Sequence, residues 1–263
     1  MDLGLKDKVV IVAASSAGLG KATALGFAKE GAKVVICGRD AERLQAARDE
    51  IFEVTSAELM SVQMDVTVAA SINALVESVA AQFGSVDVLV NNAGGPPPGL
   101  FWETQDEDWQ KAYELTLMSS VRMTRAVLPY MRKQQWGRII NITSTTVKQP
   151  IDQLLLSNSL RLAVVGWAKT LSNQLACEGI LINNVCPGWT STERVTRLTQ
   201  ARAKDNQSSA EAEIAAIASQ IPMRRLGSPE EFANMVVFLG SERASYITGA
   251  SIQIDGGSTA GFN

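Results

Sequence analysis

Residues 8–38 read KVVIVAASSAGLGKATALGFAKEGAKVVICG, and this stretch decides the fold. Two apolar runs rich in β-branched residues, 8–14 and 32–38, have the composition of buried strands. Between them, a glycine-rich turn leads into a helical pattern from about Gly18 to Glu30. A strand, a helix and a second strand of this kind predict two parallel strands joined by a crossover helix.

The rest of the chain repeats this alternation of short apolar runs and longer helical patterns. Five further runs have strand composition: 59–66, 86–94, 137–144, 180–188 and 251–257. Their near-continuous hydrophobicity is typical of strands that are buried on both faces. We therefore expect an α/β fold over residues 1–263, a single doubly wound domain whose seven-stranded, mostly parallel sheet has helices on both faces.

Two other segments bear on this organisation. A long helical pattern runs from residue 106 to residue 136. The least regular segment, about 189–223, contains the polar run ARAKDNQSSAEAE and is expected to be a substrate-loop insertion. It is either a mobile lid near a site or a solvated insertion, and its composition fits both.

Composition narrows the classes of function. The 263 residues are 46% hydrophobic and 19% charged, and a net charge of −3 offers no footprint for nucleic acid or an anionic membrane. No secretory signal or membrane-spanning run is visible, so we expect a cytoplasmic protein with no membrane partner. The three cysteines are far apart in apolar settings, so we expect all of them to be buried, reduced thiols. Because there is no histidine, a Ser-His-Asp triad is excluded and no metal site is expected.

The glycine-rich turn is where we expect a phosphate group. Gly18 and Gly20 follow the first strand and open a helix, where free backbone N–H groups favour an anion. A second strand about twenty residues later is the context that a dinucleotide site requires. That strand ends in Gly38 and Arg39 instead of an acidic residue, so we expect NADP(H) to be favoured over NAD(H). The alternative is that Arg39 is an ordinary solvent-facing side chain.

Several short motifs occur in the order found in a known family. They are SSAGLG at 15–20, MDVT at 64–67, NNAG at 91–94, NITS at 141–144, NNVCPG at 183–188 and YITGASIQIDGG at 246–257. Together they resemble the short-chain dehydrogenase/reductase family over nearly the whole chain, and within it the 3-oxoacyl-(acyl-carrier-protein) reductases. The resemblance implies a Rossmann-type fold, an NAD(P)(H)-dependent carbonyl reductase or alcohol dehydrogenase activity, and a homodimer or homotetramer.

The resemblance also implies which residues surround the cofactor. Asp65 and Val66 border the adenine, and Asn91, Ala93 and Gly94 line the ribose. The residues that face the nicotinamide end are Pro187, Gly188, Thr190 and Thr192. With Arg39, the expected cofactor-binding residues are Ala14, Ser15, Ser16, Ala17, Gly18, Leu19, Gly20, Arg39, Asp65, Val66, Asn91, Ala93, Gly94, Pro187, Gly188, Thr190 and Thr192.

The chain departs from the family at its catalytic positions. The family uses an Asn, a Ser, a Tyr and a Lys, and only the serine is retained, as Ser144. The other three positions fall on Thr116, Ser157 and Arg161, and the first motif glycine falls on Ala14. The candidate catalytic residues are therefore Ser144, Ser157, Arg161 and Thr116. Taken without the family, Ser157 fits a helix cap and Arg161 a surface side chain.

These replacements change the chemistry of the site. A tyrosine beside a lysine delivers a proton because its phenol titrates at about pH 10 or below, whereas a serine hydroxyl is a far weaker acid. Arg161 stays charged, although it can hydrogen-bond a ribose, a phosphate or a carboxylate. Three arrangements remain open. Ser144 and Ser157 hold a carbonyl oxygen while water relays the proton, Arg161 stabilises an oxyanion by charge alone, or the site binds nucleotide without reduction.

Two functions therefore compete with an NADP(H)-dependent carbonyl reductase. One is a nucleotide-binding scaffold or regulator without redox turnover, and the other is a purely structural subunit that has also lost the cofactor. The sequence does not identify the small-molecule carbonyl or alcohol substrate, because residues 189–223 contain no motif that indicates which chemical group they bind.

Overall fold

The computed structural model describes residues 1–261, and within them the chain forms a seven-stranded sheet with every neighbouring pair parallel. The strands are β1 (Val9–Val12), β2 (Lys33–Gly38), β3 (Leu59–Gln63), β4 (Val88–Asn91), β5 (Gly137–Ile142), β6 (Ile180–Pro187) and β7 (Ser251–Ile254). Their order is β3-β2-β1-β4-β5-β6-β7. Each strand lies within one of the seven predicted runs, so the doubly wound parallel sheet is confirmed.

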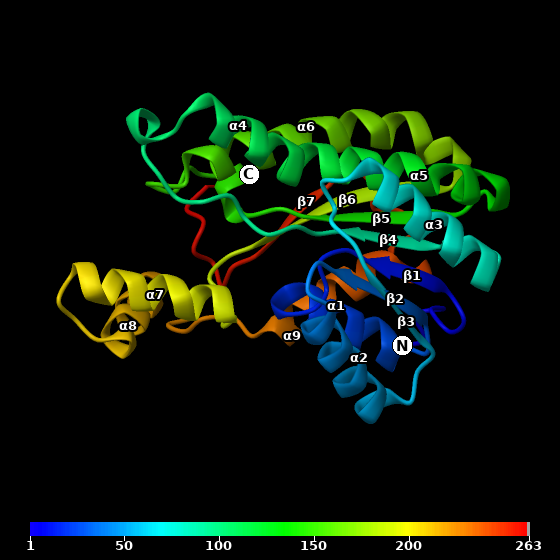
Figure 1. The fold of residues 1–263 in the computed structure, drawn as a ribbon, viewed down its shortest axis with the longest axis horizontal. Coiled ribbons are helices and arrows are strands. Elements are labelled where there is room, and N and C mark those ends of the chain that lie inside the picture. The colour runs from blue at the N-terminus through cyan, green and yellow to red at the C-terminus, as the bar shows by residue number, and fades with distance from the viewer. Residues whose placement is uncertain (262–263) are drawn as a thin grey trace.

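Helices cover both faces of this sheet (Figure 1). One face carries α1 (Gly18–Lys29), α2 (Ala41–Thr55) and α9 (Pro229–Gly240), and the other carries α3 (Ala69–Phe83), α5 (Ser119–Gln134) and α6 (Leu155–Leu175). Alternate residues of β1 serve the two layers, because Val10 and Val12 join one core cluster while Val9 and Ile11 join the other. Burying such a side chain contributes about 1.5–3 kcal/mol, which explains why the strands are apolar on both faces.

The long helical pattern over residues 106–136 is interrupted in the structure. It forms α4 (Asp106–Tyr113), a π-helical segment η2 (Glu114–Met118) and then α5. Arg122 holds this segment, since its Nη1 donates to the Glu114 carboxylate at 2.5 Å and to the carbonyl oxygen of Thr67 at 3.0 Å. The apolar pattern gave no sign of the wider turn, and π segments are frequent at functional sites.

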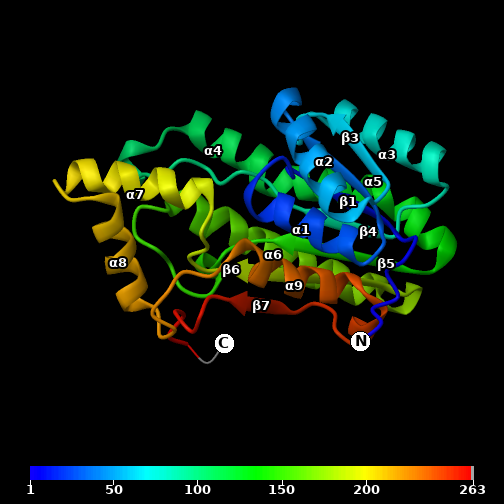
Figure 2. The same cartoon turned by 90° about the horizontal axis from the view of Figure 1, so that it is seen from below.

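Residues 189–223, the least regular segment of the sequence, contain two helices, α7 (Glu193–Asp205) and α8 (Ala210–Gln220). Figures 1 and 2 both show them beyond the carboxyl ends of the strands, on the side away from α2 and α3. The side chain of Ser209 caps α8 by accepting from the N–H of Ala212 at 3.1 Å. The polar run of the sequence therefore spans the end of α7, a turn and the start of α8, where few side chains are buried.

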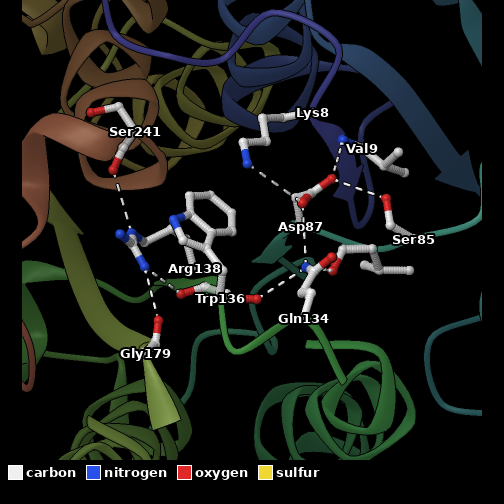
Figure 3. A network of polar contacts seen from close by, with 11 residues as sticks. Lys8, Val9, Ser85, Asp87, Gln134, Trp136, Arg138, Gly179 and Ser241 are labelled. Carbon is white, nitrogen blue, oxygen red and sulfur yellow. Dashed lines mark hydrogen bonds and ion pairs between the residues drawn. The ribbon is translucent and has the colours of Figure 1, made fainter. Parts of the chain in front are cut away.

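A buried polar network joins β1, β4 and β5 at their amino ends (Figure 3). The Asp87 carboxylate accepts from the N–H of Val9 at 2.8 Å and from Nε2 of Gln134 at 3.3 Å. Arg138 donates to the carbonyl oxygen of Gly179 at 3.1 Å, and burial lowers its pKa to about 10. Because these buried polar groups have hydrogen-bond partners, they stabilise the sheet at the amino ends of its strands, opposite the carboxyl ends.

Three further observations concern membranes, metals and thiols. No helix within residues 1–261 combines the length and hydrophobicity that crossing a membrane requires. The same residues contain no group of three or more His, Cys, Asp or Glu side chains placed to hold a metal ion. All three cysteines are free thiols; Cys37 and Cys186 are buried as expected, whereas the expected burial of Cys177 is wrong, because its side chain is exposed after the end of α6.

Candidate active site

A cavity of about 550 Å³ opens at the carboxyl ends of β1, β4, β5 and β6, where the strand order reverses between β1 and β4. Ligands of open parallel sheets bind at such a reversal. Most of the predicted site residues line it: Ala14, Ser16, Ala17, Gly18, Leu19, Gly20, Arg39, Asp65, Val66, Ala93, Gly94, Ser144, Ser157, Arg161, Pro187, Gly188, Thr190 and Thr192. Ser15, Asn91 and Thr116 are outside this lining.

The turn after β1 has the features of a phosphate cradle. Ala17 precedes α1 in an extended conformation and provides no capping side chain, so the first N–H groups of the helix are available to an anion. Gly18 has a φ of +56°, which glycine adopts without the steric cost of a Cβ. A Cβ at Gly20 would lie 2.8 Å from Nδ2 of Asn92 and against the Ala14 carbonyl oxygen. Gly20 therefore serves the packing of the turn, and Gly18 serves its conformation.

Ala14 and Ser15 have structural roles in this turn. Ala14 has a φ of +46°, in the left-handed region that disfavours an alanine, and its carbonyl oxygen accepts from Nδ2 of Asn92 at 3.1 Å. The buried Ser15 hydroxyl donates to the carbonyl oxygen of Val12 at 2.7 Å and accepts from the N–H of Cys37 at 3.0 Å. Ser15 thus joins β1 to β2 and points away from the cavity.

The end of the cavity beside β2 is basic. Arg39 follows β2 on the cavity wall and forms no ion pair within residues 1–261. Asp40 accepts from the N–H of Arg43 at 3.0 Å as the cap of α2. Arg43 in turn lies 2.6 Å from the Glu193 carboxylate at the start of α7. The only acidic side chain beside Arg39 in the sequence is therefore engaged in capping a helix.

Two of the predicted site residues, Asp65 and Asn91, are held by hydrogen bonds within the fold. Asp65 Oδ1 accepts from the N–H of Thr67 at 2.9 Å and from its hydroxyl at 2.8 Å, which shapes the turn after β3. Asn91 is buried, and its Nδ2 donates to Oδ1 of Asn141 at 2.9 Å. The Asn91 side chain therefore belongs to the sheet interior, while residues 93–94 line the cavity.

The loop after β6 faces the glycine-rich turn across the cavity. Pro187 ends β6, and Gly188 packs so closely on Asp255 that a Cβ would lie 2.7 Å from the Asp255 Cβ. Thr192 precedes α7, and its Cβ lies 3.8 Å from the position that a Cβ on Gly18 would take. The start of α7 and the start of α1 thus form two walls of one cavity.

Arg161 and Ser157 lie together on α6 at the inner end of the cavity. Nε of Arg161 donates to Oγ of Ser157 at 3.2 Å, and its Nη1 donates to the carbonyl oxygens of Ile142 and Thr143, both at 3.0 Å. Burial, together with repulsion from Arg194, lowers the pKa of Arg161 to about 10. The guanidinium therefore remains charged at neutral pH and is fixed between α6 and the end of β5.

Ser144 lies at the same end, in the turn after β5. Its Oγ accepts from the N–H of Thr146 at 3.1 Å, just as Oγ of Ser157 accepts from Arg161. Neither hydroxyl donates a hydrogen bond to another atom of residues 1–261. Each hydroxyl is thus oriented by an N–H donor and keeps its own hydrogen for an oxygen atom that enters the cavity.

Thr116 is placed differently from the other candidate catalytic residues. It lies in the π segment η2, is buried, and its hydroxyl has no partner among the described residues. Because it does not line the cavity, its catalytic role stays a prediction.

Comparisons with known proteins agree with this geometry. The family model described as enoyl-(acyl carrier protein) reductase matches residues 13–259. A 3-oxoacyl-(acyl-carrier-protein) reductase from Aquifex aeolicus is 35% identical over 258 residues, which cover 98% of this chain and 99% of that protein. The chain belongs to the short-chain dehydrogenase/reductase family.

Solved structures of other short-chain dehydrogenase/reductases have the same fold. L-sorbose reductase from Gluconobacter frateurii, complexed with NADPH and L-sorbose, has a TM-score of 0.95 at 36% identity, covering 99% of this chain and 100% of that one. Actinorhodin polyketide ketoreductase with NADPH has a TM-score of 0.93 at 33% identity, covering 97% and 98%. Because all these relatives are reductases, the chain is an oxidoreductase of the short-chain dehydrogenase/reductase type.

Sequence reasoning missed part of this short-chain dehydrogenase/reductase site. Arg194 and Arg197 line the cavity from α7, and Arg43 lines it from α2. The sequence contains a pattern that indicates them, because TERVTR at 192–197 places two arginines three residues apart, on one face of a helix. The segment looked irregular, so no helix face was assigned to it.

Proposed function

We propose that this protein is an NADP(H)-dependent carbonyl reductase of the 3-oxoacyl reductase kind, in which Ser157 and Arg161 replace the tyrosine and lysine of the family. The observation that carries the proposal is the pair of oriented hydroxyls, Ser144 and Ser157, at the inner end of a cavity suited to a dinucleotide. The relatives named as NADPH complexes and as ketoreductases support it.

The residues present fit a pyridine dinucleotide. The uncapped start of α1 and Gly18 would hold the diphosphate. A Cβ added at Gly94 would meet no atom within 4 Å, so the wall beside β4 leaves room for a ribose. Arg39 would pair with a 2′-phosphate at the basic end, which favours NADP(H) over NAD(H).

The catalytic part of the proposal concerns the carbonyl oxygen of the substrate. When bound, the nicotinamide supplies the hydride. Ser144 and Ser157 donate hydrogen bonds to the oxygen, and the charge of Arg161, 3.2 Å from Oγ of Ser157, stabilises negative charge as it develops there. A serine hydroxyl is too weak an acid to supply the proton by itself. The proton therefore comes from water and passes through the Ser157 hydroxyl, whose oxygen stays hydrogen-bonded to Arg161.

A nucleotide-binding scaffold without turnover is the second candidate. It is favoured by the two hydrogen bonds from Nη1 of Arg161 to the Ile142 and Thr143 carbonyl oxygens. Through these bonds Arg161 connects α6 to the end of β5, which is a structural role that requires no catalytic turnover.

The deciding experiment measures NADPH binding by fluorescence and NADPH oxidation with a panel of carbonyl compounds that includes 3-oxoacyl thioesters. We expect turnover with at least one compound and a loss of about 10²- to 10³-fold in kcat in Ser144→Ala and in Ser157→Ala. Ser159→Ala is the matched control, because Ser159 is exposed on the same helix and donates to the Leu155 carbonyl oxygen. Tight NADPH binding without oxidation of any compound would instead support the scaffold.

The proposal also covers assembly and compartment. We propose a homodimer or homotetramer in the cytoplasm that acts on small molecules. The exposed apolar side chains Leu162 on α6 and Tyr113 on α4 support self-association, and the free cysteines support a reducing compartment. Light scattering on the purified protein measures the assembly state.

A further inference from the structure

Three arginines line the cavity in addition to Arg39 and Arg43. Arg161 comes from α6, and Arg194 and Arg197 lie one turn apart on α7. The Arg194 guanidinium reaches the loop after β4, because a Cβ on Gly95 would collide with it. The Arg194 side chain thus extends over the cavity toward the sheet, and Arg197 lines the same cavity.

Within the described part of the chain, these cations have no acidic partner. Within residues 1–261, none of the three lies within ion-pair distance of a carboxylate. Glu193, the acidic neighbour of Arg194 in the sequence, pairs with Arg43 instead. Desolvation and then repulsion from Arg197 lower the pKa of Arg194. Like charges on a cavity wall are stabilised by an anion that enters the cavity.

Other groups already serve the anions of the dinucleotide. In the proposed function, the start of α1 holds the diphosphate and Arg39 the 2′-phosphate. Arg161 instead lies beside Ser157, where the substrate carbonyl is placed. We therefore propose that the substrate is an oxo acid, a small carbonyl compound whose carboxylate binds Arg194, with Arg161 and Arg197 adding positive charge. This inference rests on the proposed function and specifies its substrate class.

Guanidinium groups suit this task because they bind carboxylates through two parallel hydrogen bonds. The dinucleotide diphosphate offers oxygens of similar chemistry, so the experiment must separate the two sources of the anion. Arg194 is the residue to change, since it is exposed on α7 and holds no other part of the fold by an ion pair within residues 1–261.

The test measures ligand binding to the full chain saturated with NADP⁺, so that no turnover is needed. Calorimetric titrations compare pyruvate, acetoacetate and levulinate with the methyl ester of each acid. We expect at least one acid to bind about 10- to 100-fold more tightly than its ester. Arg194→Gln should reduce the affinity for that acid to the affinity for its ester and leave the ester unchanged, while Arg194→Lys restores part of the difference. Arg48→Gln, which removes an exposed arginine of α2, is the matched control and should change neither.

Equal binding of acids and esters, or no binding by any of the acids, would overturn the inference. A weaker affinity for NADP⁺ in Arg194→Gln, with the acid-to-ester ratio unchanged, would also overturn it and assign Arg194 to the diphosphate. Acid binding that depends on Arg194, in a protein that oxidises no NADPH, would support the anion site and contradict the reductase proposal. The two proposals therefore fail in distinguishable ways.

Discussion

Nε of Arg161 donates to Oγ of Ser157 across one turn of α6, at 3.2 Å. The same guanidinium is tied to two carbonyl oxygens at the end of β5, so it cannot turn away from the serine without losing both bonds. A lysine would carry its charge on a flexible chain, whereas this arginine holds it in one place. In the proposed reductase, Arg161 polarises a hydroxyl and does not exchange protons.

This relationship predicts the pH dependence of the reaction. Burial lowers the pKa of Arg161 from its ordinary value to about 10, so the stabilising charge is present at lower pH and lost as pH rises through about 10. We expect kcat/KM to be level from about pH 6 to about pH 9 and to fall near about pH 10. In Arg161→Lys the fall should move to lower pH, because burial lowers a lysine from an ordinary pKa of about 10.4. A wild-type inflection at neutral pH would show that another group carries the proton.

Arg39 predicts the cofactor preference. Arg39→Gln should weaken NADPH binding by about 10- to 100-fold and leave NADH binding nearly unchanged, since only NADPH carries the 2′-phosphate that Arg39 would pair with. Fluorescence titration of both nucleotides measures the ratio. Arg48→Gln on α2 controls for the loss of one surface charge. An equal loss of affinity for both nucleotides would contradict the proposed pairing of Arg39 with the 2′-phosphate.

The left-handed backbone of Ala14 predicts a change in stability. Ala14→Gly should raise the free energy of unfolding by about 1 kcal/mol, because glycine removes the Cβ that disfavours a φ of +46°. Ala13→Gly, at the buried neighbour without a positive φ, should lower it by about 1 kcal/mol. Urea denaturation of both variants provides the measurement. A loss of stability in both variants would contradict this reading of the turn.

The Asp87 network predicts a loss of stability without a loss of activity. Asp87→Ala leaves the buried N–H of Val9 without its acceptor and should lower the free energy of unfolding by about 2–4 kcal/mol. The folded variant should keep its kcat/KM, since the network lies at the amino ends of the strands. Asp49→Ala, at an exposed position of α2, should change stability by less than about 0.5 kcal/mol. A reduced kcat/KM in folded Asp87→Ala would show that the network at the amino ends of the strands affects the cavity at their carboxyl ends.

The strands of this fold follow from the local sequence more completely than the walls of the cavity do. All seven strands could be predicted because each is a short β-branched run whose character depends on its own residues. The cavity lining around residues 14–20 followed from a turn that is local in sequence. The place of Arg194 on the cavity wall depends on how α7 packs against the rest of the fold. The family resemblance places Asn91 at the ribose, whereas its side-chain nitrogen donates to Asn141 inside the sheet.

By itself, then, the sequence determined the parallel sheet and the glycine-rich turn, and it placed Ser157 and Arg161 four residues apart on one helix. These features depend on which residues are adjacent or one helical turn apart. Only the tertiary structure decided that Arg161 braces Ser157 against the end of β5, and that the arginines of α7 line the same cavity. Such contacts join segments far apart in the chain, whose approach is set by the packing of whole helices on the sheet and leaves no local pattern in the residues.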